Sequence, residues 1–218
     1  MSAVGERPVP YAVRTERLHL RAWGPADAEE FAQVRERDRA HLTRYGGNFV
    51  RTPSRAAGLQ RMLHYRGQFD LDERWRWCAR SSAGELVGGV SLRPHDAGVV
   101  ELGWWLSAPS TGRGLATEAA SALLHVAFRL WGAQRVEARM DTRNEPSRAV
   151  AERLGLACEG RLGHALMGEG PEALDLWLYA LTATSYAQLE GVRPAPHCED
   201  ALGRAILAGD ERAGATAL

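Results

Sequence analysis

The chain has 218 residues, and its 27 basic and 27 acidic residues give a formal charge of zero, so nothing in the charge balance favours nucleic acid as a partner. All 27 basic residues are arginines, and the absence of lysine excludes a Walker-type phosphate loop and a lysine Schiff base. Three widely spaced cysteines, no metal-ligand spacing and no membrane-length apolar run lead us to expect a cytoplasmic protein with no metal and no membrane contact.

Hydrophobic periodicity and turn signals divide most of the chain into strands and helices. In chain order the pattern predicts strand Leu18–Arg21, helix Gly24–Val34, helix Thr52–Leu63, strands Trp75–Arg80, Leu86–Leu92 and Val99–Leu106, helix Leu115–Trp131, strand Gln134–Asp141, helix Asn144–Leu154, and strands Ala157–Leu162 and Ala173–Leu181. Hairpins followed by β-α-β crossovers imply an α/β (α+β) fold with a mixed sheet and helices on both faces.

The character of the sequence changes after Thr182. The spacing of Leu202, Ile206 and Leu207 predicts a short amphipathic helix within Glu199–Arg212, after a proline-rich linker. We therefore divide the chain into a domain over residues 12–182 and a C-terminal tail over residues 183–218. The tail is either loosely packed, as termini commonly are, or a contact for a lid or for a second copy in a homodimer.

The segment between strand Val99–Leu106 and helix Leu115–Trp131 is rich in glycine. Gly112 and Gly114 allow a tight turn and a close approach of a ligand, and the helix start supplies free N–H groups and the positive end of a dipole. This combination predicts a phosphate site. A dinucleotide fold is the weaker alternative, because Thr117 replaces its third glycine and the connecting loop is long.

Five ordered motifs resemble the GNAT superfamily of acyl-CoA-dependent N-acyltransferases, and most closely its RimJ/RimL branch. They are Thr15–Arg21, Glu101–Leu106, Gly112–Ala119, Asn144–Ser147 with Leu154–Gly160, and Asp175–Tyr179. The resemblance implies a GNAT fold, with a mixed sheet of about seven strands that is splayed between the fourth strand, Val99–Leu106, and the fifth, which begins near Arg135.

The resemblance also implies a set of cofactor-binding residues. These are Trp104, Trp105, Leu106, Thr111, Gly112, Arg113, Gly114, Leu115, Ala116, Thr117 and Asn144. Thr111 departs from the family pattern, which has glutamine or arginine at that position, so one side-chain contact to phosphate is lost while the backbone cradle remains. Asn144 is equally well explained as a helix N-cap.

Two residues are candidates for proton transfer. Glu101 interrupts an apolar strand, so it is either a general base, acting directly or through water, or the partner of an arginine on a neighbouring strand. Ser147 is either the acid that protonates the leaving thiolate, as the resemblance implies, or a residue of the first helical turn. His164 and Asp175 are candidates for substrate contact, and Asp175 could instead pair with an arginine.

Taken together, the motifs predict an enzyme that transfers acetyl from acetyl-CoA to a primary amine by direct attack, releasing CoA. The acceptor is a protein or peptide N-terminus or a small-molecule amine. The alternatives are a non-catalytic acyl-CoA-binding sensor module and an acyltransferase that uses a different acyl-CoA.

Overall fold

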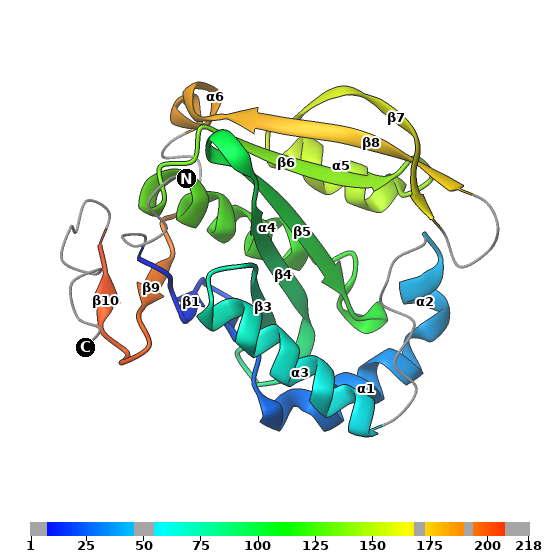
Figure 1. Cartoon of the computed structure of the whole chain (residues 1–218), viewed down its shortest axis with the longest axis vertical. Coiled ribbons are helices and arrows are strands. Elements are labelled where there is room, and N and C mark those ends of the chain that lie inside the picture. The colour runs from blue at the N-terminus through cyan, green and yellow to red at the C-terminus, as the bar shows by residue number, and fades with distance from the viewer. Residues whose placement is uncertain (1–7, 46–54, 168–172, 190–193, 208–218) are drawn as a thin grey trace.

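The computed structural model describes residues 8–45, 55–167, 173–189 and 194–207. Its strands are β1 Ala12–Arg14, β2 Leu18–Ala22, β3 Trp75–Ser81, β4 Leu86–Pro94, β5 Val99–Leu106, β6 Arg135–Asp141, β7 Ala157–Met167, β8 Ala173–Thr182, β9 His197–Glu199 and β10 Ala205–Ile206. Its α-helices are α1 Ala28–Arg37, α2 Arg39–Thr43, α3 Arg55–Asp70, α4 Leu115–His125, α5 Glu145–Arg153 and α6 Ala183–Gln188. Figure 1 shows these elements arranged around one curved sheet.

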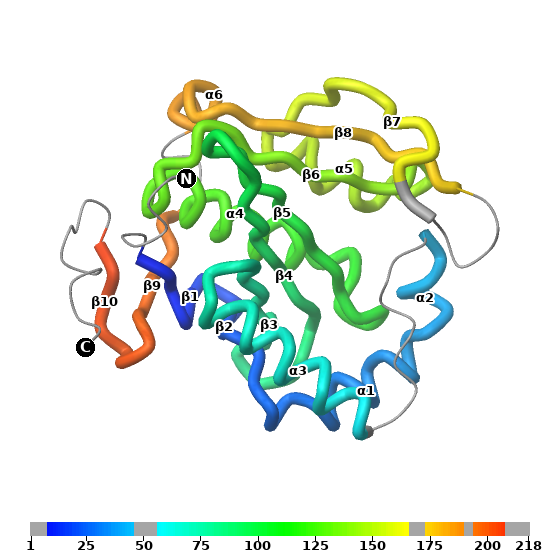
Figure 2. The backbone as a smooth tube through the Cα atoms, viewed as in Figure 1, coloured from blue at the N-terminus to red at the C-terminus, as the bar shows by residue number. Residues whose placement is uncertain are grey.

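The sheet is mixed, as predicted, but it has ten strands where about seven were expected. Its order is β10-β9-β1-β2-β3-β4-β5-β6-β8-β7, and among these pairs only β5 and β6 run parallel. The additional strands are β1, β9 and β10, all at one edge (Figure 2). Each is only two or three residues long, which is too short for a periodic pattern to identify in the sequence.

Helices cover both faces of the sheet, which confirms the predicted fold class. On one face α4 packs against β4 and β5 and continues into the π-helical η4 Val126–Leu130, while α5 packs against β6. On the other face α1 and α3 form a smaller core around Phe31, Met62 and Cys78, each at most 1% exposed. No helix in the described residues is both long and apolar enough to cross a bilayer, and these residues contain no metal-binding cluster of histidine, cysteine or carboxylate side chains.

The predicted tail helix is wrong for residues 199–206. Cys198 and Ile206 are 3% and 7% exposed and enter the main core, whereas Leu202 is 74% exposed at a turn. That turn is held by Asp200, whose carboxylate accepts the N–H groups of Leu202 and Arg204. The strands bury alternate residues, and β9 pairs with β1, so the tail completes the sheet. Residues 208–212 of the predicted helix lie outside the described residues.

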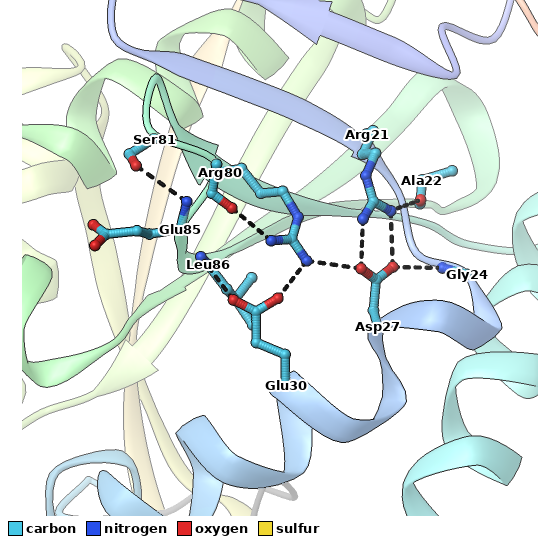
Figure 3. A network of polar contacts seen from close by, with 10 residues as sticks. Arg21, Ala22, Gly24, Asp27, Glu30, Arg80, Ser81, Glu85 and Leu86 are labelled. Atoms are coloured by element: carbon cyan, nitrogen blue, oxygen red, sulfur yellow. Dashed lines mark hydrogen bonds and ion pairs between the residues drawn. The ribbon is translucent and has the colours of Figure 1, made fainter.

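A buried ionic network attaches α1 to the sheet (Figure 3). Asp27, only 1% exposed, accepts two hydrogen bonds from Arg21 at 2.5 and 2.8 Å and one from Arg80 at 2.9 Å. Arg80 also pairs with Glu30 at 2.6 Å. Burial alone would raise the pKa of Asp27, but the hydrogen bonds from Arg21, the Gly24 N–H and Arg80 outweigh it and lower the pKa. Every charge in this network has a partner.

Candidate active site

The candidate site begins where two neighbouring strands separate. The parallel strands β5 and β6 are in register at three positions, ending at Glu101 and Glu137. Beyond that pair β5 continues to Leu106 beside β4, while β6 continues to Asp141 beside β8. The sheet is therefore splayed between these two strands, as the family resemblance predicted. We call the Glu101–Glu137 pair the vertex of the splay.

The glycine loop opens α4 with a free helix N-terminus. Gly112 and Gly114 have φ angles of +73° and +76°, a conformation that side chains disfavour. Glu118 is the first residue whose N–H reaches back, to the Gly114 carbonyl at 3.0 Å. The N–H groups of Leu115, Ala116 and Thr117 precede it and have no carbonyl four residues earlier in the helix. The loop can therefore bind an anion with its backbone.

Two residues of the turn between β1 and β2 hold this loop in place. Glu118 accepts hydrogen bonds from the Thr15 hydroxyl at 2.6 Å and the Arg17 backbone N–H at 2.9 Å, and it pairs with the Arg17 guanidinium at 2.5 Å. Arg17 also donates to the Arg113 carbonyl at 2.9 Å. Burial would raise the pKa of Glu118, but these bonds lower it. The role of Thr15 and Arg17 was not predicted, although both belong to the first motif.

A cavity of about 1570 Å³ connects the loop with the splayed strands. The predicted residues that line it are Trp104, Trp105, Leu106, Thr111, Gly112, Gly114, Ala116, Thr117, Asn144 and Ser147. Arg113 and Leu115 are not among the lining residues, and Leu115 is 5% exposed in the core. The structure thus brings most of the predicted cofactor-binding residues and one candidate catalytic residue to one cavity.

The two polar residues at the start of α5 face the same cavity. Asn144 is the N-cap, and its side-chain oxygen accepts the Ser147 N–H at 3.1 Å. The capping alternative for Asn144 is therefore correct, and it does not exclude a ligand contact because Asn144 also lines the cavity. The cap uses the backbone of Ser147, so it leaves the hydroxyl available for chemistry.

Two details of the loop fit a phosphate-bearing ligand such as CoA. The Thr117 hydroxyl oxygen is buried and has no hydrogen-bond partner within the described residues, although it belongs to a cavity-lining residue. A side chain added at Gly112 would meet no protein atom within 4 Å, so that side of the loop is open. The Thr111 hydroxyl, in contrast, donates to the Ala108 carbonyl at 2.9 Å and stabilises the loop itself.

Glu101 lies at the vertex, beyond the cavity lining. Its carboxylate pairs with Arg93 of β4 at 2.6 Å and contacts His95 Nε2 at 3.3 Å, and its side chain is 20% exposed. The arginine partner weighed as an alternative from the sequence is therefore present. The partly exposed carboxylate can still be reached by water.

The two candidate substrate residues lie together on the β7–β8 hairpin and outside the cavity lining. Asp175 accepts the His164 backbone N–H at 2.8 Å and pairs with Arg161. The Arg161 hydrogen bond, followed by the His164 N–H, lowers the pKa of Asp175. The arginine pairing that the sequence left open for Asp175 is what the structure has. Neither residue is brought to the cavity.

Sequence reasoning missed further cavity-lining residues besides Thr15 and Arg17, and two distant segments supply some of them. His41 of α2 lines the cavity and lies 3.2 Å from the Leu106 carbonyl, through its Nε2 atom. Residues 194–197 of the tail also line it, because β9 seats them beside Arg14. No local signal marks either segment, since their positions depend on contacts between distant parts of the chain.

Comparisons with known proteins agree with this geometry. A protein-family model described as "Acetyltransferase (GNAT) domain" matches residues 17–157. A Bacillus subtilis protein named "Putative ribosomal N-acetyltransferase YdaF" is 29% identical over 170 residues, covering 76% of this chain and 91% of that protein.

Solved structures share the fold. Mycobacterium smegmatis RimJ in complex with CoA-disulfide superimposes with a TM-score of 0.75 at 24% identity, covering 86% of this chain and 97% of that one. RimL, a ribosomal L7/L12 alpha-N-protein acetyltransferase in complex with coenzyme A, gives a TM-score of 0.74 at 19% identity, covering 80% and 99%. The chain therefore belongs to the GNAT family of acetyltransferases, which confirms the family and the enzyme class that its motifs predicted.

Proposed function

We propose that the protein transfers acetyl from acetyl-CoA to a primary amine, at a peptide N-terminus or on a small molecule. The observation that carries this proposal is the single cavity that joins an anion-binding helix start to the splay between β5 and β6. It is supported by the similar folds of RimJ and RimL, whose structures contain CoA.

In this proposal the glycine loop and the Thr117 hydroxyl hold the pyrophosphate. Backbone N–H groups at the start of α4 supply fixed donors, and Gly112 lets the phosphate approach. Trp104, Trp105 and Leu106 line the path from the loop toward the vertex, along the edge of β5 that has left β6. Acetyl-CoA supplies an activated acetyl thioester when bound.

Glu101 and Ser147 act at opposite sides of the reacting atoms. An amine attacks only as its neutral form, so its proton must be removed, and we assign that role to Glu101 acting through water, since the carboxylate lies outside the cavity lining. Arg93 and His95 hold the carboxylate at the vertex. The Ser147 hydroxyl protonates the departing sulfur. No covalent intermediate on the protein is needed, and Cys78 is buried and its pKa is raised by that burial to about 11.

The experiment is thiol release from acetyl-CoA in the presence of a panel of amine-ended peptides and small amines. Thiol release that depends on an added amine supports the proposal. Tight binding of CoA without turnover on any amine would favour a sensor module instead. Release from a longer acyl-CoA and not from acetyl-CoA would change the acyl donor and leave the site assignment intact.

A further inference from the structure

A group of arginines lies on the sheet face that carries α1 and α3. We call Arg35, Arg61, Arg74, Arg76 and Arg93 the arginine cluster. In this order, they come from α1, α3, the segment that precedes β3, β3 and β4. The Arg76 guanidinium lies 4.3 Å from the centre of the Tyr65 ring, and the Arg61 guanidinium lies 6.0 Å from it. Tyr65 therefore lies beside two members of the cluster.

The cluster carries more positive charge than its neighbours neutralise. Within the described part of the chain, Arg93 pairs with Glu101, whereas Arg35, Arg61, Arg74 and Arg76 form no ion pair. Arg76 donates to the neutral Gln68 at 2.5 Å. The Nε atoms of Arg74 and Arg93 are buried without a hydrogen-bond partner in the same described residues. At Asp27, by contrast, both arginines pair with carboxylates, although the Arg80 Nε atom is likewise buried without a partner in the described residues.

Burial increases the free-energy cost of this excess positive charge. Arg35 is 8% exposed, and its guanidinium lies 5.5 Å from the centre of the Phe31 ring but forms no hydrogen bond or ion pair within the described residues. Burial first, and then neighbouring arginines, lower the pKa of Arg35 and Arg74 and bring that of Arg76 to about 10. Partly buried arginines that repel one another destabilise a fold unless an anion offsets them. The cluster is therefore complementary to a negatively charged ligand.

The register of the sheet places the cluster beside the vertex. Cys78, Gly89 and Trp105 form one row across β3, β4 and β5, and Arg76, Ser91 and Gly103 form the next row on the same face. Arg93 and Glu101 form the third row. Rows of this kind are about 7 Å apart. On β5, Gly103 lies between Trp105, which lines the cavity, and the candidate base Glu101. Because Gly103 has no side chain, β5 leaves space on this face between those two residues.

We propose that the arginine cluster binds carboxylates of the acceptor, and that the preferred acceptor is a peptide with acidic residues directly after its free amino group. This inference rests on the proposed function, because it takes the vertex to be the place where the amine reacts. A peptide fits better than a single amino acid because residues two apart in an extended chain are also about 7 Å apart, which matches the spacing of the rows.

The test compares two peptides that differ only in aspartate or asparagine at their second and fourth positions. We expect kcat/KM to be about tenfold higher for the aspartate peptide at low salt, since hydrogen bonds to charged groups contribute more than neutral ones. The preference should shrink as salt is added. Equal values, or a preference for asparagine, would overturn the inference.

Substitutions identify the residues responsible. R76Q and R61Q should each reduce the ratio between the two peptides severalfold. The matched control is R66Q on the same helix, α3, because Arg66 lies outside the cluster and is paired with Asp70 at 2.7 Å. A ratio that stays the same in R76Q and R61Q, or that falls equally in R66Q, would contradict the assignment.

Equilibrium binding separates this inference from the proposed function. Both peptides are titrated into the CoA-loaded protein, and the aspartate peptide should bind about tenfold more tightly. This result without turnover would support the cluster while the transferase proposal fails. Turnover of both peptides with equal affinity would support the transferase and overturn the cluster.

Discussion

Glu101 and Glu137 are the last pair of residues that β5 and β6 hold in register, and beyond them the two strands diverge. Directly opposite carboxylates would repel each other, but each has its own arginine partner: Arg93 lies 2.6 Å from Glu101 and Arg135 lies 2.8 Å from Glu137. The two residues therefore share a sheet face, a position along the splay and an ion-paired state. They differ in that Glu101 lies on β5, the strand whose later residues line the cavity.

This relationship gives a matched test of the general base. E101Q should lower kcat by about 10²-fold or more, because it removes the proton acceptor and keeps the shape of the side chain. E137Q removes the same charge across the vertex and should leave kcat within a few-fold. The measurement is steady-state acetyl transfer with the affinity for CoA determined in parallel. Full activity in E101Q, or an equal loss in E137Q, would reduce Glu101 to a structural ion-pair partner.

The Ser147 hydroxyl can be tested without disturbing the helix that carries it. In S147A the backbone N–H still donates to Asn144, so the cap and the folding stability should remain close to those of the wild type. The turnover rate should fall by about tenfold or more if the hydroxyl protonates the leaving thiolate. N144A is the complementary variant, since loss of the cap should lower the free energy of unfolding by about 1 kcal/mol. Unchanged kcat in S147A would remove its catalytic role.

Two glycine substitutions can separate the effect of backbone strain from the effect of a lost ligand contact. Gly112 and Gly132 both have positive φ, +73° and +64°, and neither has a protein atom within 4 Å of an added Cβ. G112A and G132A should therefore destabilise the fold similarly, by about 1 kcal/mol. Only G112A should weaken CoA binding, since its methyl group would occupy space next to the free N–H groups of α4. Calorimetric titration measures the CoA affinity of both variants, and equal affinities would contradict the assignment of the loop.

Asp27 should make the protein sensitive to acid. Its folded-state pKa is lowered from 3.8, so its contribution to stability is present above that value and is lost as the pH falls through the lower folded pKa. At neutral pH D27N should cost about 3 kcal/mol, because it leaves Arg21 and Arg80 without a full partner. The difference from wild type should shrink below pH 3.8. Urea unfolding of both proteins from neutral pH to below pH 3.8 measures this difference. D70N is the control, because Asp70 belongs to an exposed ion pair with Arg66. A pH-independent difference would contradict the assignment.

The fold could be predicted from the sequence where local pattern carries the information. The strand Val99–Leu106, the glycine loop and the Asn144 cap all have short-range signals, and each is present in the structure. The splay was accessible only through the family resemblance, because strand divergence depends on register between β5 and β6 rather than on the composition of either.

What was missed depends on contacts between distant segments. β9 forms because Cys198 lies opposite Val13 in the register with β1, and no pattern near Cys198 indicates that partner. The helix predicted there used Leu202 and Leu207, which are 74% and 67% exposed. His41 likewise approaches Leu106 only because α2 folds over the end of β5. The arginine cluster gathers side chains from four elements and a loop, so its excess charge cannot be seen in the sequence order.

The most direct test of acetyl transfer by this protein is to locate the transferred acetyl group. The protein is incubated with isotopically labelled acetyl-CoA and a peptide that has both a free α-amino group and an internal lysine, and the product is mapped by fragmentation mass spectrometry. We expect a labelled acetyl group on an amine, with CoA released in equal amount, and a large loss of both products in E101Q. CoA retained by the wild-type protein, with no labelled acetyl group on any amine, would contradict it.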